Sequence, residues 1–119
     1  MQPDKPVIFA FATMTMNTID RLQQWYSHQC NGEWEHSFGI SIQSCDNPGW
    51  WVKINLVGTP LQNKPFTEIA QGVDAHRFAR GSQWLSCYTE DGIWHGAGDA
   101  LKLEYILEIF LTWAEKNGG

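Results

Sequence analysis

The chain has little positive charge. Eight of its 119 residues are Lys or Arg and 13 are Asp or Glu, so the formal net charge is −5 at pH 7. Nucleic-acid binding relies on clustered cations that contact phosphates, and we therefore expect no nucleic-acid partner. An acidic domain is better suited to a basic protein partner, because complementary electrostatic fields raise the rate and specificity of association.

Cysteines are few and long hydrophobic runs are missing. Cys30, Cys45 and Cys87 form no close pair, which is typical of a reducing compartment. No segment approaches the roughly 18 apolar residues of a membrane-spanning helix. The apolar run from Val7 to Ala12 is too short for a secretory signal and lacks its basic flank. These features predict a cytoplasmic protein that does not associate with a membrane.

The length and composition predict one globular domain. Apolar residues make up 43% of the chain and charged residues 18%, and 119 residues can bury a core without disulfides or metals. We assign residues 16–117 to this domain. Residues 1–15 form an N-terminal extension, either a strand or a disordered segment, because the apolar run Val7 to Met14 follows Pro6.

Two helices are predicted, one at each end of the domain. Asn17 is a good N-cap for the first, whose apolar residues recur with helical spacing until Asn31 and Gly32, where the glycine would supply the left-handed C′ residue. Asp99 is expected to cap a second helix from about Leu101 to Lys116, which carries a wide apolar stripe.

Between the helices the sequence alternates in the manner of antiparallel strands. The predicted strands are residues 38–44, 50–57, 83–89 and 93–97, with residues 66–73 as an ambiguous further strand. A type II turn is expected at residues 46–49, which contain Pro48 and Gly49, and a second hairpin at Glu90-Asp91-Gly92. The predicted fold is therefore α+β: an antiparallel sheet of four to five strands with both helices packed on one face.

The predicted core combines one face of the first hairpin with the apolar sides of both helices. Its expected members are Phe38, Ile40, Ile42, Val52, Ile54 and Leu56 from the strands, and Leu22, Tyr26, Leu103, Ile106, Leu107 and Phe110 from the helices.

Tryptophan is abundant, and four of the seven tryptophans lie between residues 25 and 51. Such a cluster marks either an unusual core or a recognition surface, and the sequence leaves both open for Trp34. Trp34, Trp50 and Trp51 could also form a platform for sugars or bases. Because Trp50 and Trp51 point to opposite sides of one strand, at most one of them could join Trp34.

Sites for catalysis or metal binding are weakly supported. The histidines and cysteines lack the spacing of zinc ligands, and the acidic neighbour Asp46 does not favour a nucleophilic thiolate at Cys45. Glu33, Glu35 and His36 could perform acid–base work, but they equally suit a surface rim. We therefore predict no catalytic residue, metal or cofactor.

Two short segments carry a family resemblance. Gly32-Glu33-Trp34-Glu35-His36 and Asp46-Asn47-Pro48-Gly49-Trp50, together with the leading helix and the Leu-rich closing helix, resemble the immunity protein 53 family over about Asn17 to Lys116. Members are bacterial proteins associated with polymorphic toxin systems. The resemblance implies a non-enzymatic inhibitor that binds and neutralises a cognate toxin, and it does not specify the toxin's activity.

A candidate toxin interface follows from the acidic and aromatic residues. Interfaces concentrate binding energy in a few aromatic anchors ringed by polar groups. The predicted interface residues are Glu33, Trp34, Glu35, His36, Asp46, Trp51, Glu90 and Asp91. The alternative hypothesis is a small enzyme or ligand-binding domain with a pocket around Trp34, Glu35 and His36.

Overall fold

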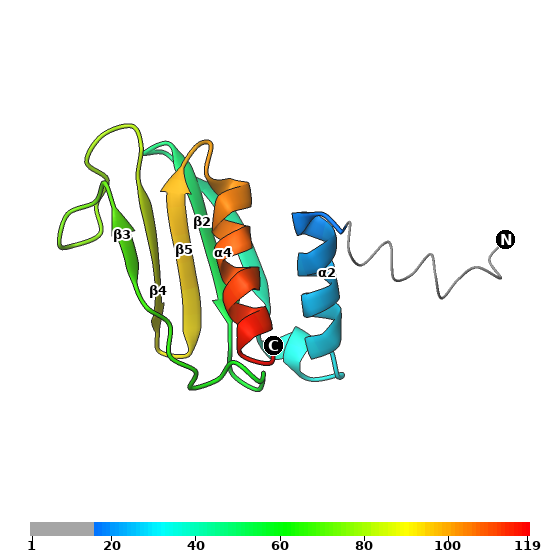
Figure 1. Cartoon of the computed structure of the whole chain (residues 1–119). Coiled ribbons are helices and arrows are strands. Elements are labelled where there is room, and N and C mark those ends of the chain that lie inside the picture. The colour runs from blue at the N-terminus through cyan, green and yellow to red at the C-terminus, as the bar shows by residue number, and fades with distance from the viewer. Residues whose placement is uncertain (1–15) are drawn as a thin grey trace, which may run out of the picture.

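The computed structural model describes residues 16–119, and the strand or disordered segment expected at residues 1–15 lies outside the described residues. The elements follow the chain as α2 (Thr18–Gln29), α3 (Trp34–Ser37), β1 (Ile40–Cys45), β2 (Gly49–Asn55), β3 (Ile69–Gln71), β4 (Leu85–Glu90), β5 (Ile93–Asp99) and α4 (Leu103–Lys116). The five strands form one sheet in the order β1-β2-β5-β4-β3, in which all neighbours are antiparallel. α4 packs on one face of the sheet alongside β5, and α2 packs beside α4 (Figure 1). The predicted α+β class is confirmed.

The first helix begins where the sequence predicts and ends earlier. The Asn17 side chain accepts a hydrogen bond from the backbone N–H of Asp20 at 2.8 Å, as an N-cap does. The helix ends at Gln29 because Cys30 is already extended, with φ −69° and ψ 118°. Gly32 has a φ of +93° but lies in the link to α3, so its predicted role as the C′ residue of α2 is wrong.

The first hairpin has the predicted faces but a different start. Val52 and Ile54 are completely buried beneath the helices, whereas Trp51 is 39% exposed on the opposite face. β1 begins at Ile40, two residues later than predicted, and Phe38 lies outside it. The turn between β1 and β2 lies at residues 46–48, within the predicted segment, and contains a cis Asn47–Pro48 peptide bond.

The second hairpin is confirmed and the ambiguous strand is short. Asp91 and Gly92 form the tight turn between β4 and β5, and both have positive φ, at 54° and 78°, as type I′ turns require. β3 spans only Ile69–Gln71, because Gly72 turns the chain with a φ of +68°. Phe66 instead leaves the sheet and packs edge-on against Trp94, with ring centroids 5.8 Å apart.

The core is built around tryptophan. The buried rings of Trp25, Trp34, Trp94 and Phe110 pack edge-to-face in a chain of contacts, with centroids 5.0 to 5.9 Å apart. Of the predicted core residues, Val52, Ile54, Leu56, Leu22, Ile106, Leu107 and Phe110 are buried.

Three predicted core residues lie at the surface. Phe38 and Ile42 are each 41% exposed and Tyr26 is 38% exposed. Ile42 is exposed because β1 is an edge strand, and Phe38 because it precedes that strand. The core prediction is wrong at these positions.

Asp99 fixes the start of the second hairpin and does not cap α4. Its carboxylate accepts hydrogen bonds from Lys102 Nζ at 2.6 Å and from the backbone N–H groups of Trp84 and Leu101 at 2.9 and 3.1 Å. The bond from Lys102, followed by that from Trp84, lowers the pKa of Asp99 to about 2. α4 begins at Leu103, with Lys102 at its N-cap position, so the predicted capping role is wrong.

Gly96 allows α4 to approach the sheet closely. A Cβ atom at this position would lie 2.5 Å from Ile106 Cγ2 and 2.5 Å from the Trp94 ring. We expect Gly96→Ala to lower the free energy of unfolding by about 1–3 kcal/mol through overpacking. Urea denaturation measures this change in stability. A Gly96→Ala midpoint equal to that of the wild type would contradict this packing.

Candidate functional site

α3, the chain that follows β2 and the β4–β5 turn lie at one end of the sheet, which we call the α3 end. The backbone O of Gly39 accepts a hydrogen bond from Asn55 N–H at 3.0 Å, and the O of Gly92 accepts one from Leu56 N–H at 2.8 Å. Gly58 lies against the Trp34 ring. This end contains six of the predicted interface residues, because they belong to α3, to its N-cap position or to the β4–β5 turn: Glu33, Trp34, Glu35, His36, Glu90 and Asp91.

Asn31 and Glu35 shape the chain around α3. The Asn31 side chain accepts hydrogen bonds from the backbone N–H groups of Glu33 and Trp34, at 2.9 and 3.0 Å. The Glu35 carboxylate accepts hydrogen bonds from Asn31 N–H at 2.9 Å and from Gly32 N–H at 2.8 Å. Backbone N–H groups, first that of Glu35 itself, lower the pKa of its carboxyl. Glu35 therefore remains ionised and holds the loop, whereas a general acid needs a raised pKa.

Trp34 belongs to the core. It is 3% exposed, meets Trp25 edge-on at a centroid distance of 5.9 Å and lies 5.8 Å from the Tyr26 ring. Its indole N–H finds no hydrogen-bond acceptor among residues 16–119. The sequence left open whether Trp34 belongs to the core or to a recognition surface. The structure places it in the core, so Trp34 cannot serve as an exposed anchor.

The exposed aromatic residues at the α3 end are Phe38 and Tyr26. Phe38 lines a hollow of about 270 Å³ together with Ile93, which follows the β4–β5 turn. Both aromatics were predicted to be buried, because strand and helix periodicity placed them in the core.

Carboxylates without cationic partners gather at the α3 end. Within the described part of the chain, no Lys, Arg or His nitrogen lies within 4 Å of the Glu33, Glu35, Glu90 or Asp91 carboxylates. Glu33, Glu90 and Asp91 are exposed. We call these four residues the acidic end. They provide a field that would attract a basic surface.

The remaining predicted interface residues lie elsewhere. Asp46 is in the β1–β2 turn at the opposite end of the sheet, where Gly49 pairs with Asp99. Trp51 lies on the sheet face that the helices leave uncovered, with Lys53 Nζ 4.8 Å from its ring centroid. The acidic end therefore does not include these two residues.

The tryptophans do not form a platform for sugars or bases. Trp34 is buried, and the Trp50 indole N–H donates to the backbone O of Ala100 at 3.0 Å. Trp51 stands on the other face, beside the His95 ring at 6.2 Å. Three indoles in three different environments cannot stack together on one ligand.

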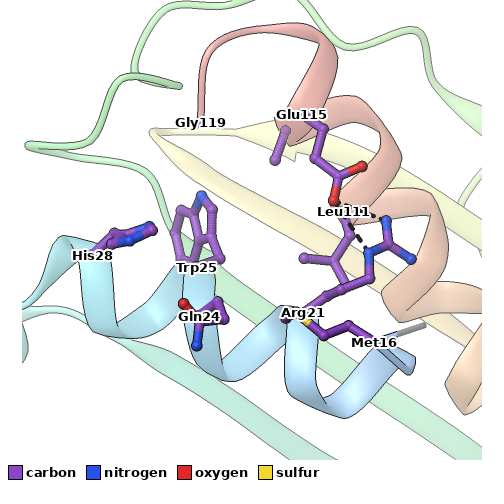
Figure 2. A pocket seen from close by; sticks show the side chains of 9 residues that line it. Met16, Arg21, Gln24, Trp25, His28, Leu111, Glu115 and Gly119 are labelled. Atoms are coloured by element: carbon purple, nitrogen blue, oxygen red, sulfur yellow. Dashed lines mark hydrogen bonds and ion pairs between the residues drawn. The ribbon is translucent and has the colours of Figure 1, made fainter. Parts of the chain in front are cut away.

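A groove of about 540 Å³ separates α2 from the end of α4 (Figure 2). Arg21 crosses it and donates to Glu115 at 3.0 Å and to Glu108 at 2.8 Å. Trp25 and His28 stand on the α2 side. The charges pair with one another, and residues 16–119 contain no group of three His, Cys, Asp or Glu side chains that could hold a metal ion. This groove presents no catalytic arrangement.

The three cysteines form no disulfide with one another. All are free, and Cys87 is buried in the core, where burial raises its pKa to about 12. We expect a triple variant with Cys30→Ser, Cys45→Ser and Cys87→Ala to fold and to function as the wild type does. Loss of function in a folded Cys45→Ser protein would show that this thiol is required.

These observations describe a small α+β domain that offers exposed, charged surface and no assembled catalytic site within residues 16–119. None of the described helices has the length and apolar character needed to cross a membrane. A family model for immunity protein 53 matches residues 19–115. The chain therefore belongs to the immunity protein 53 family, as its two motifs suggested, and family membership implies immunity against a toxin. No curated protein and no solved structure matches the chain.

Proposed function

We propose that this protein neutralises its cognate toxin by binding it directly, without catalysing a reaction, and that the acidic end contacts a basic surface of the toxin. Family membership supports the immunity role. The observation that carries the choice of surface is the gathering of Glu33, Glu35, Glu90 and Asp91 without cationic partners. Electrostatic complementarity of this kind raises the association rate of protein pairs.

Exposed aromatic residues support the same end of the sheet as the surface that contacts the toxin. Phe38 and Tyr26, at 41% and 38% exposure, provide apolar area beside the carboxylates. An apolar centre surrounded by polar groups is the usual anatomy of a protein–protein interface. Phe38 takes the anchor role that the sequence analysis gave to Trp34.

The alternative of an enzyme or ligand-binding domain around Trp34, Glu35 and His36 has less support. Trp34 is buried, and both carboxylate oxygens of Glu35 already accept backbone hydrogen bonds. Only His36 remains free to act, and a single exposed histidine makes no catalytic pair.

The test is co-purification with a toxin domain encoded by a reading frame adjacent to the gene for this chain. An inactivated toxin variant is co-expressed with the tagged immunity protein and passed over a size-exclusion column. We expect a one-to-one complex that weakens as salt concentration rises. If the folded toxin elutes alone at low salt while the chain still protects cells, direct binding is not the mechanism.

A further inference from the structure

The free edge of β1 presents unpaired backbone groups. β1 is the outermost strand and pairs only with β2 within the described chain. Because Gly39 O accepts the N–H of Asn55, the alternation of antiparallel pairs places Ser41 and Gln43 in hydrogen-bonded positions against β2. The N–H and C=O groups of Ile40, Ile42 and Ser44 therefore point away from the sheet.

This edge lacks the usual protection against pairing with another chain. Natural edge strands are kept apart by charged residues, proline, bulges or short length. The six residues of β1, Ile-Ser-Ile-Gln-Ser-Cys, include neither a charge nor a proline. The other edge strand, β3, has only three residues. An unprotected edge of this length is a surface on which a partner strand can add to the sheet.

Acidic residues stand at both ends of this edge. Glu33 and Glu35 precede β1 across α3 and Phe38, and Asp46 follows its last residue. The strand between them is about 20 Å long, at roughly 3.3 Å per residue. Ile42, which is 41% exposed on the helix side of the sheet, leaves an apolar area near the middle.

We infer that the β1 edge binds an extended segment of the toxin, with basic residues near both ends of the segment and an apolar side chain over Ile42. This inference rests on the proposed function and states how the partner docks. In this arrangement the toxin segment forms a sixth strand of the sheet. Asp46, which lies far from the acidic end, then also contacts the toxin.

Electrostatic complementarity favours the toxin over two other possible occupants of the β1 edge. A second copy paired antiparallel through β1 would place Glu33 and Glu35 of one protomer beside Asp46 of the other, and like charges repel. The apolar segment from Val7 to Met14 of the same chain has one cationic side chain nearby, Lys5 beside Asp4, and none in residues 15–20 that follow it, so it cannot complement the acids at both ends. A toxin strand with basic residues near both of its ends complements the acidic residues at both ends of β1.

Amide hydrogen exchange followed by NMR, with the inactivated toxin domain as probe, tests the docking mode. In the free protein we expect the amides of Ile40, Ile42 and Ser44 to exchange fast, and those of Ser41 and Gln43 slowly. In the complex, the three outward amides should become protected. Protection that is already present in the free protein, lost on deletion of residues 1–15 or on dilution, would instead indicate the chain's own segment or a second copy.

A proline substitution supplies the matched test of binding. Ser44→Pro removes an outward N–H while keeping every hydrogen bond of β1 to β2, and edge strands accept proline at such positions. We expect Ser44→Pro to raise the Kd for the toxin domain about tenfold, because one backbone hydrogen bond is lost and the ring obstructs the partner. Ser44→Ala should bind as the wild type does.

The outcomes separate the two proposals. If the wild-type protein does not bind the toxin, the proposed function fails. If the wild type binds and a folded Ser44→Pro variant binds equally well, with no new amide protection in β1, the edge-docking inference is wrong while the proposed function stands.

Discussion

Phe110→Ala is expected to lower the free energy of unfolding by about 3–5 kcal/mol, the largest stability loss that we predict for a single substitution. Phe110 is completely buried, and its ring lies 5.0 Å from that of Trp25 and 5.2 Å from that of Trp94. It therefore joins α2, α4 and the sheet in one contact. Truncation removes the transfer free energy of the ring and leaves a cavity among rigid aromatic neighbours that cannot collapse into it.

Urea denaturation followed by tryptophan fluorescence measures this loss. Tyr105→Ala is the control, since Tyr105 lies on the same helix and is 53% exposed. It should change the stability by no more than about 0.5 kcal/mol. Ile54→Ala, in the buried face of β2, should cost about 2–5 kcal/mol. An unshifted denaturation midpoint for Phe110→Ala would contradict this description of the core.

Charge reversal at the acidic end should slow association with the toxin about tenfold at low salt. The variant Glu33→Lys/Glu90→Lys suits this test because both side chains are exposed and neither has a cationic partner within 4 Å in the described residues. Glu35 is left unchanged, because its carboxylate holds the loop before α3. Stopped-flow association rates at two salt concentrations give the readout.

A variant elsewhere on the surface separates local from total charge. Asp20→Lys/Ser82→Lys/Ala100→Lys changes the formal net charge from −5 to −1, as the first variant does. These three exposed residues lie in the first turn of α2, shortly before β4 and directly after β5, at the end of the sheet opposite α3. We expect this control to slow association far less. Equal slowing by both variants would show that only total charge matters and that the acidic end is not the contact surface.

The sequence predicted elements whose signals are local. The Asn17 cap with helical apolar spacing identified the start of α2, and strict alternation identified the buried face of β2 at Val52 and Ile54. The Asp91-Gly92 dipeptide identified the β4–β5 turn through its need for positive φ. In each case a few neighbouring residues determine the backbone.

Features that depend on contacts between elements could not be predicted from the sequence. The turn that leads into α3 forms because Asn31 and Glu35 accept backbone hydrogen bonds, and Asn31 beside Gly32 was a turn signal that could have revealed it. The burial of Trp34 depends on Trp25, nine residues earlier in the chain, which periodicity cannot show.

The candidate site was only partly predictable for the same reason. Glu90 and Asp91 share an end of the sheet with Glu33 and Glu35, and not with Asp46, because β5 and not β4 lies next to β2. No local signal encodes that strand order. The exposure of Phe38 likewise follows from where β1 begins, and strand ends are poorly marked in sequence.

The central claim is that this protein inhibits its toxin by forming a complex and not by catalysis. The most direct measurement is a titration of the active toxin domain, at a concentration far above the Kd, with increasing amounts of this protein. We expect the residual toxin activity to fall linearly and to vanish at one equivalent. Complete inactivation by a small fraction of an equivalent would demonstrate turnover, and undiminished activity in excess protein would demonstrate that no inhibitory complex forms. Either result would contradict the claim.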